Sequence, residues 1–523
     1  MSTKEDFKSI KVRMYGHRLD IHDRFVQKDD FNFNETINQI ESLVNFGRKD
    51  NIVINIDLHI SNYQRGSNYF RINSILEIAR KFGIKKIQLN LINPVRGNLI
   101  ATLDEVSSYI SKARYVFLFD LFIKVKGLPY CLIPEPEAVI IKSENRDQFR
   151  KVSQCRKCTY NQKCDGILKG YFHGLDLKKI KPKILPKEVM IEVTSQCNFN
   201  CQFCFNQASF AKNGRQDKEM SKDFIKKIID NLKKNNVSFV RFTGGEPLLR
   251  KDIFELMDYA KSKDLEVRMN TNAYLIKDYK SVKKLAQYLD YVLISMHAYN
   301  TINEKAVTGT RDSFAKKIRA IQWFKEAGVK VVRVNTVASP ENISNLEKFY
   351  KLFQKMGVDK WQIDRVMPIS GQRNNWGKKE ASLLIEKALN IKKDIVKKKS
   401  SLKVHIINAL PLCVCDPIKT SPVCSGAHSV DGHERFVVDP RGFAKPIYYM
   451  EENIGNPLDI QKCWNHPFMR FLRDYKNLPK ECRKCAFLEK CKGGNRYCAY
   501  VSGGDYKAAD PLMNYSNVEK YIW

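Results

Sequence analysis

Hydrophobic and polar positions follow a regular order between residues 188 and 400. Short apolar runs are followed by longer segments in which apolar residues recur every three or four positions. The runs predict strands, and the longer segments predict Lys-rich amphipathic helices. Because a helix follows each strand, we expect a parallel sheet with its active site at the carboxyl ends of the strands. The expected strands lie at 189–194, 237–242, 265–270, 291–296, 330–337 and 361–364, with helices such as 222–233 and 312–327 between them.

The region before this alternation, residues 1–180, has a similar but looser pattern. The run at 115–125 holds two charged residues and is too short to span a bilayer, so it predicts a buried strand. A Lys- and Pro-rich stretch at 175–187 predicts a linker. The other expected elements are strands at 52–60 and 86–92 and helices at 72–82 and 103–110.

The region after the alternation, residues 401–523, is rich in loops. Short runs at 434–438 and 444–449 flank Asp439-Pro440-Arg441-Gly442, which predicts a hairpin turn. We therefore expect three domains, at 1–180, 188–400 and 401–523.

Composition adds a basic charge and many cysteines. The 523 residues carry a formal net charge of +33. One interpretation of this charge is a general abundance of Lys, Asn and Ile, because Lys is spread along the whole chain. The other is an acidic partner such as RNA, a membrane surface or an acidic peptide. The opening MSTKEDFKSI lacks the apolar stretch of a signal peptide, so we expect a cytoplasmic protein. In that compartment the 15 cysteines indicate metal binding and not disulfides.

Three cysteines lie in one loop, IEVTSQCNFNCQFCFN, directly after the first strand of the central region. Cys197, Cys201 and Cys204 have the spacing C-x3-C-x2-C. Three thiolates on a tight loop can bind three irons of a cubane cluster and leave the fourth iron open for a cofactor. Zinc normally takes a fourth Cys or His close by, and the Asn and Gln residues between the cysteines do not supply one. The loop therefore predicts a [4Fe–4S] cluster.

A second motif, Thr243-Gly244-Gly245-Glu246-Pro247, ends the second strand. Its glycines allow a ligand to approach the backbone, and its carboxylate can pair with an ammonium group. Together with the cysteine loop and the aromatic Phe203 before the third cysteine, this motif resembles the radical S-adenosylmethionine (SAM) superfamily. The resemblance covers residues 188–510 well and 1–175 loosely.

The resemblance implies an α/β fold: a partial (β/α)6 TIM-type barrel, a degenerate half-barrel-like α/β region before it and a loop-rich Fe–S domain after it. It implies two cofactors, a [4Fe–4S] cluster and SAM, and a reaction in which SAM is cleaved reductively to a 5′-deoxyadenosyl radical. His297 and Asp364 are candidates for substrate contact. The residues expected to bind the cofactor are Phe203, Gly244, Gly245, Glu246, Asn272, Ser295 and Asn335.

The C-terminal region resembles the SPASM extension of many radical SAM enzymes, which binds two auxiliary clusters. The spacing C-x2-C-x5-C of Cys482, Cys485 and Cys491 fits this extension. Other family cysteines are replaced, by Ile447, Asn495 and Met513. The pattern implies that one auxiliary cluster is lost, or is rebuilt from Cys413, Cys415 and Cys424. The other cluster would keep its three ligands and recruit Cys498, with zinc on the same residues as the alternative.

A separate set of four cysteines lies in the N-terminal region: Cys131, Cys155, Cys158 and Cys164. Four thiolates complete a cluster and leave no open iron. The set resembles the cluster-bearing end of another half-barrel of this kind that cannot cleave SAM. Zinc and free thiols are the alternatives. Cys463, near aromatic residues, predicts a packing cysteine.

The substrate is inferred from the family alone. SPASM members mostly modify peptides and proteins, so the resemblance implies hydrogen abstraction from a peptide or protein during maturation of a ribosomally made peptide, with ferredoxin or flavodoxin as electron donor. Tailoring of a cofactor such as haem, RNA modification and a non-catalytic Fe–S scaffold are alternatives. The chain has no RNP-like sequence and no basic–aromatic repeat, so neither nucleic acid nor a membrane is an expected partner.

Overall fold

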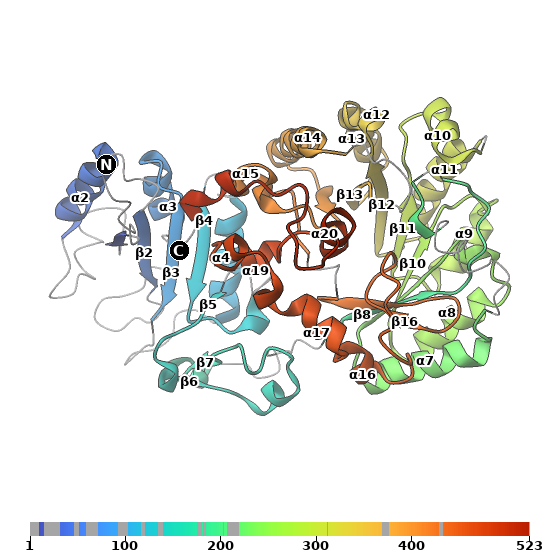
Figure 1. Cartoon of the computed structure of the whole chain (residues 1–523), viewed down its shortest axis with the longest axis horizontal. Coiled ribbons are helices and arrows are strands. Elements are labelled where there is room, and N and C mark those ends of the chain that lie inside the picture. The colour runs from blue at the N-terminus through green and yellow to red at the C-terminus, as the bar shows by residue number, and fades with distance from the viewer. Residues whose placement is uncertain are drawn as a thin grey trace. The chain divides into compact units, whose positions relative to one another are not determined.

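The computed structural model divides the chain into two compact units (Figure 1). The first unit is Met1–Ile184 with Lys484–Lys490 and Val518–Trp523, and the second is Leu185–Arg483 with Cys491–Asn517. Within the described part of the chain, no helix is both long and apolar enough to cross a membrane. The structure describes residues 10–14, 32–46, 52–58, 72–92, 103–116, 121–133, 140–174, 180, 185–201, 203–206, 219–310, 312–368, 376–427 and 432–521.

The first unit contains a five-stranded parallel sheet in the order β1-β2-β3-β4-β5. Every residue of β2 is buried, as the apolar run predicts. The strands are β1 (Ile10–Met14), β2 (Ile52–Leu58), β3 (Lys86–Leu91), β4 (Phe122–Lys126) and β5 (Ile140–Ile141), and the helices are α2 (Phe33–Asn45), α3 (Ile72–Lys81) and α4 (Leu103–Val116).

The expected strand at 115–125 is wrong in its first part. Helix α4 continues to Val116, and strand β4 begins only at Phe122. The buried residues of α4 include Val106, Ile110 and Ala113, so the helical spacing of apolar residues runs on past 110. Apolar runs of this length do not distinguish a strand from a buried helix end.

The second unit is built on a nine-stranded sheet in the order β14-β13-β12-β11-β10-β9-β8-β15-β16. All neighbours pair in parallel except β15 and β16, which form the expected hairpin. The six strands expected from the sequence are confirmed with ends shifted by one or two residues, and three strands from the 401–523 region extend the same sheet. The strands are β8 (Glu188–Glu192), β9 (Phe239–Thr243), β10 (Glu266–Thr271), β11 (Tyr291–Ser295), β12 (Val331–Ala338), β13 (Lys360–Arg365), β14 (Lys403–Ile407), β15 (Arg435–Val438) and β16 (Ala444–Lys445).

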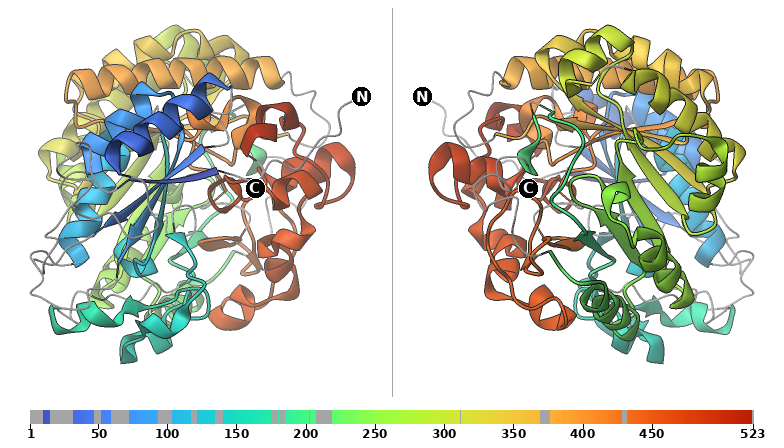
Figure 2. Two further views of the ribbon diagram at one scale, coloured as in Figure 1. Left: turned by 90° about the vertical axis from the view of Figure 1, so that its left-hand side faces the viewer. Right: turned by 90° about the vertical axis from the view of Figure 1, so that its right-hand side faces the viewer.

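Helices cover the outer face of this sheet, as Figure 2 shows. On β12 every second residue is buried, including Val332 and Val334, while Arg333, Asn335 and Val337 between them line a cavity on the other face. Strand β12 therefore turns an apolar face to the helices and a mostly polar face to the cavity. The longer helices are α7 (Lys222–Lys234), α8 (Ile253–Ser262), α9 (Tyr279–Ala286), α10 (Thr301–Thr308), α11 (Ser313–Glu326), α13 (Leu346–Lys355) and α14 (Lys378–Lys397).

Candidate active site

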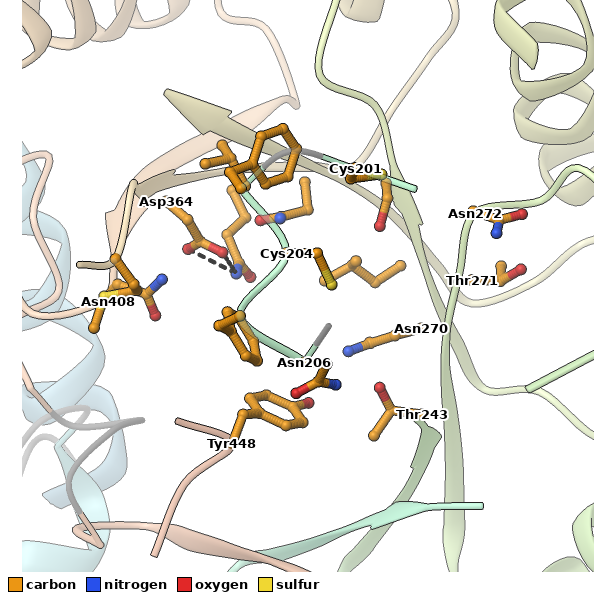
Figure 3. A pocket seen from close by; sticks show the side chains of 18 of the residues that line it. Cys201, Cys204, Asn206, Thr243, Asn270, Thr271, Asn272, Asp364, Asn408 and Tyr448 are labelled. Atoms are coloured by element: carbon orange, nitrogen blue, oxygen red, sulfur yellow. Dashed lines mark hydrogen bonds between the residues drawn. The ribbon is translucent and has the colours of Figure 1, made fainter. Parts of the chain in front are cut away.

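Cys197, Cys201 and Cys204 line one cavity of about 250 Å³ at the carboxyl ends of the second unit's strands. The loop that carries them turns tightly, because the Cys204 amide donates to the Cys201 carbonyl (3.1 Å). The Cys197 sulfur accepts from the Phe199 amide at 3.5 Å. Figure 3 shows Cys201 and Cys204 opposite the ends of the neighbouring strands. The structure thus brings the three cysteines to the place that the sequence predicts.

The surroundings of the Cys197 and Cys201 thiols raise their pKa values. Burial, and next the neighbouring Cys204, raise the pKa of Cys201 to about 12. Burial also raises the pKa of Cys197. As thiolates, three groups lining one cavity would need a cation to offset their charge, and a metal centre supplies that charge. The donor set therefore fits an iron–sulfur cluster.

The glycines of the Gly-Gly-Glu turn let the cysteine loop approach the backbone. A Cβ atom on Gly245 would lie 2.0 Å from the Gln196 carbonyl oxygen, and one on Gly244 would lie 2.3 Å from that of Thr194. The Gly245 amide donates to the Thr194 carbonyl at 2.8 Å. These glycines therefore lock the turn after β9 to the loop, a role that the sequence did not reveal.

Glu246 lies behind the cavity wall and does not line it. One carboxylate oxygen accepts from the Thr271 hydroxyl (2.7 Å) and the Leu248 amide (3.2 Å), and the other accepts from the Asn272 amide (2.7 Å). Burial raises the pKa of Glu246 to about 7. The carboxylate thereby fixes the end of β10, where Asn272 enters the cavity.

The other expected cofactor-binding residues line the same cavity: Phe203, Gly244, Gly245, Asn272, Ser295 and Asn335. The Asn272 amide group donates to the Asn198 side chain at 2.8 Å. The side-chain oxygen of Asn335 is buried and has no hydrogen-bond partner. An unsatisfied acceptor in a cavity is suited to a bound ligand that donates to it.

His297 and Asp364, the candidates for substrate contact, also line the cavity. The Nδ1 atom of His297 accepts from the Val337 amide at 3.1 Å, and its ring packs edge-on against Phe203. Burial lowers the pKa of His297 well below 6.5, so its ring is neutral. Burial raises the pKa of Asp364 to about 6, although hydrogen bonds from Gln362 and Asn335 act to lower it.

The N-terminal cysteines lie near one another in the first unit. Burial, followed by Cys164, Cys155 and Cys158, raises the pKa of Cys131 to about 12. The Tyr130 amide donates to the Cys164 sulfur at 3.5 Å. In the described ranges, the Cys197 loop included, no three His, Cys, Asp or Glu side chains are already gathered around a metal position, so the N-terminal cluster stays a prediction.

The C-terminal cysteines have varied surroundings. In the second unit, the Cys482 and Met513 sulfurs are 3.9 Å apart, and the Leu412 amide donates to the Cys491 sulfur at 3.4 Å. The Cys485 sulfur accepts from the Phe487 amide at 3.4 Å in the first unit. An auxiliary cluster on these residues also stays a prediction.

Cys498 is buried in an apolar cluster that also contains Ile447, one of the residues that replaces a family cysteine. Asn495, which also replaces a family cysteine, donates to the Tyr449 hydroxyl at 2.9 Å. Side-chain packing thus surrounds the two replaced positions. Cys463 is fully buried, as expected of a packing cysteine.

The sequence analysis missed a group of charged residues inside the second unit. Arg241, Arg333, Arg365, Arg435 and Lys317 all line the cavity. The signal that could have found three of them is a single Arg within an apolar strand, as in Phe239–Thr243, Val331–Ala338 and Arg435–Val438.

Comparisons with known proteins agree with this geometry. The profile of the Radical SAM superfamily matches residues 191–353. The chain is 31% identical over 281 residues to a probable GTP 3′,8-cyclase of Saccharolobus solfataricus, covering 53% of this chain and 87% of that protein. It is 24% identical over 343 residues to an AdoMet-dependent heme synthase of Nitratidesulfovibrio vulgaris, covering 63% and 92%. The crystal structure of Streptococcus suis SuiB bound to its precursor peptide SuiA has a similar fold (TM-score 0.51, 18% identity, 62% and 75% covered).

The chain belongs to the radical SAM superfamily. The family implies a [4Fe–4S] cluster and SAM as cofactors, and the cysteine-rich C-terminal region is consistent with a SPASM-like extension.

Proposed function

We propose that this radical SAM enzyme modifies a peptide or protein. The observation that carries the proposal is a single cavity in which the three loop cysteines meet polar strand ends and a row of aromatic side chains. Support for a peptide comes from the fold shared with SuiB, whose structure holds a precursor peptide. We place the enzyme in the cytoplasm, since none of the 15 cysteines is paired in a disulfide. We expect ferredoxin or flavodoxin to supply electrons.

The described residues fit both cofactors. Cys197, Cys201 and Cys204 would hold the cluster, and Gly244, Gly245, Asn272, Ser295 and Asn335 would hold SAM. When bound, the cluster supplies the electron that cleaves SAM, and the fragment released abstracts hydrogen from the substrate.

The chain's own residues orient the reactants and keep water out. Phe199, Phe203 and Phe205 line the cavity beside the cysteines and exclude solvent from it. His297 presents an uncharged ring there, because burial lowers its pKa well below 6.5, and its Nδ1 atom accepts from the Val337 amide. Glu246 holds Asn272 in place, which fixes the polar wall opposite the cysteine loop.

The test is turnover by the anaerobically reconstituted enzyme with dithionite and SAM. Short peptides encoded beside the gene are added, and 5′-deoxyadenosine and peptide mass are measured together. We expect 5′-deoxyadenosine above the peptide-free rate together with a mass change, or deuterium uptake, at a defined residue. Loss of both in the Cys201→Ala variant is the control.

Conversion of a small molecule is the second candidate, favoured by the likeness to a GTP cyclase and a heme synthase. GTP and a haem precursor are therefore assayed in parallel. Rapid conversion of either one, with no peptide changed, would overturn the peptide proposal.

A further inference from the structure

The inner face of the second unit's sheet carries a layer of arginines beneath the strand ends. Arg241 of β9, Arg333 of β12 and Arg435 of β15 point into the cavity from the deeper half of their strands. On β12, Arg333 lies two residues before Asn335, a distance of roughly 7 Å along the strand. The layer therefore lies below the residues expected to contact SAM.

The other cations of this cavity each form an ion pair with a buried carboxylate. Glu188 accepts from three arginines: Arg241 (Nη2, 2.8 Å), Arg435 (Nη1, 3.0 Å) and Arg268 (Nη1, 3.1 Å). Arg365 pairs with Asp510 at 3.2 Å, and Lys317 pairs with Glu304. Glu188 is nearly fully buried, and its pKa lies far below its usual range because the surrounding arginines outweigh burial.

Arg333 is different. Its Nη1 donates to the neutral Gln362 amide at 2.8 Å, and no carboxylate of the described residues lies within ion-pair distance of it. Its Nε atom is buried and has no hydrogen-bond partner. The Arg333 side chain is half-buried, and its guanidinium lies 4.9 Å from the centroid of the Tyr291 ring. A guanidinium in a cavity with no carboxylate in direct contact commonly marks a site where a ligand supplies the charge.

The nearest carboxylates attract Arg333 only from a distance: Glu188 and Asp364 act on its guanidinium electrostatically, and neither forms an ion pair with it among the described residues. Gln362 donates its amide to both oxygens of Asp364 (3.1 and 3.2 Å), as the dashed lines in Figure 3 show. Gln362 thus separates the guanidinium from the carboxylate.

We infer that Arg333, flanked by Arg241 and Arg435, binds an anionic oxygen-acid group of the substrate. This inference rests on the proposed function: in a peptide the group is an acidic side chain or a terminal carboxylate, and in a nucleotide it is a phosphate. Arginine presents paired N–H donors to either group. The substrate would thereby be anchored at the floor of the cavity, with its reacting carbon above, toward the cysteine loop.

The test compares charged and neutral probes on the reconstituted enzyme with SAM bound. N-acetyl-glutamate amide, its glutamine counterpart and inorganic pyrophosphate are titrated by calorimetry. We expect the acid to bind at least tenfold more tightly than the amide, and Arg333→Gln to remove this preference. Arg333→Lys should keep part of it. A preference for pyrophosphate over the carboxylate would assign the subsite to phosphate.

The control variant is Arg319→Gln, on the exposed face of α11. It should leave every probe affinity unchanged. The SAM dissociation constant of Arg333→Gln should stay within about twofold of wild type, because the subsite lies deeper than SAM. Equal weakening of SAM and probe would mean that Arg333 holds the carboxylate of SAM itself, and the inference would be wrong.

The inference and the proposed function can fail separately. If no peptide is modified but the acid still binds through Arg333, the peptide proposal fails and the subsite stands. If a peptide is modified equally well with each Glu and Asp replaced by its amide and with its C-terminus amidated, the subsite fails and the peptide proposal stands.

Discussion

At the scale of single residues, burial decides how the candidate site is charged. The Cys201 thiol, the Glu246 carboxyl and the His297 ring all have pKa values shifted toward the neutral form, with burial as the largest cause. Burial thus opposes ionisation of these three groups, and it lowers the pKa of Arg333 as well. A metal cation bound by the cysteines would favour the thiolate form and so lower the pKa of these thiols.

Replacing Cys197, Cys201 or Cys204 with Ala should abolish 5′-deoxyadenosine formation. Each variant removes one of three thiols that line the cavity, and no fourth cysteine lines it. The assay is anaerobic incubation with dithionite and SAM, followed by chromatography. Cys463→Ala, at a buried packing cysteine, is the control and should retain activity. A wild-type rate in any loop variant would exclude that cysteine as a ligand.

Glu246→Ala should raise the SAM dissociation constant about tenfold or more while iron content stays unchanged. Without the carboxylate, the Asn272 amide is left buried without its acceptor, which costs roughly 1–3 kcal/mol and loosens the cavity wall. Glu246→Gln keeps an oxygen for that amide and should be affected less. The measurement is SAM binding to the reconstituted variants, and an unchanged constant would count against any role for Glu246 in the SAM site.

His297 should make the folded state less stable at acidic pH. Its folded-state pKa lies well below 6.5, so below pH 6.5 the unfolded chain binds a proton that the native state does not. The free energy of unfolding should therefore fall by up to about 1.4 kcal/mol per pH unit as the pH drops below 6.5. Urea unfolding of the wild type and of His297→Asn, between pH 7.5 and 5.5, measures this. Identical slopes for the two proteins would show that His297 titrates normally.

At the scale of elements, the repeating strand–helix order was predictable because each strand must bury one face under a helix. The six central strands follow from that rule alone. Strand β14 was not predicted, because Lys403 and His405 alternate with its apolar residues and leave no continuous apolar run. The true role of Gly244 and Gly245 could not be predicted either, since it depends on a carbonyl more than 40 residues away in the chain.

Gly245→Ala should release the cysteine loop. The new Cβ atom would collide with the Gln196 backbone, which cannot move without shifting Cys197. We expect loss of cluster iron, measured by chemical iron analysis and by the absorbance of the reconstituted protein. Gly377→Ala is the matched control, because its Cβ would meet only the flexible end of Glu380. Full iron content in Gly245→Ala would mean that the turn and the loop move together.

At the scale of the whole molecule, the division into units changes how the N-terminal cluster should be tested. The first unit includes residues near the C-terminus: Phe487 packs against Phe122 at 4.3 Å between ring centroids, and against Tyr521 at 5.2 Å. A protein shortened to begin near residue 187 would lose the partner of Phe487 and expose an apolar surface. Substitution of the cysteines avoids this.

The last prediction concerns the number of clusters. We expect three cubanes, one on the Cys197 loop, one C-terminal and one N-terminal, or about twelve irons per chain if all are [4Fe–4S]. Cys155→Ser with Cys158→Ser should lower the iron to about eight per chain, because two of four thiols are lost.

The SAM-responsive signal in electron paramagnetic resonance should remain in this double variant, because Cys197, Cys201 and Cys204 all belong to the second unit. Cys463→Ser, at the buried packing cysteine, is the control and should leave the iron content unchanged. Unchanged iron in the N-terminal variant, or zinc in the anaerobically purified protein, would show that the first unit holds no iron–sulfur cluster.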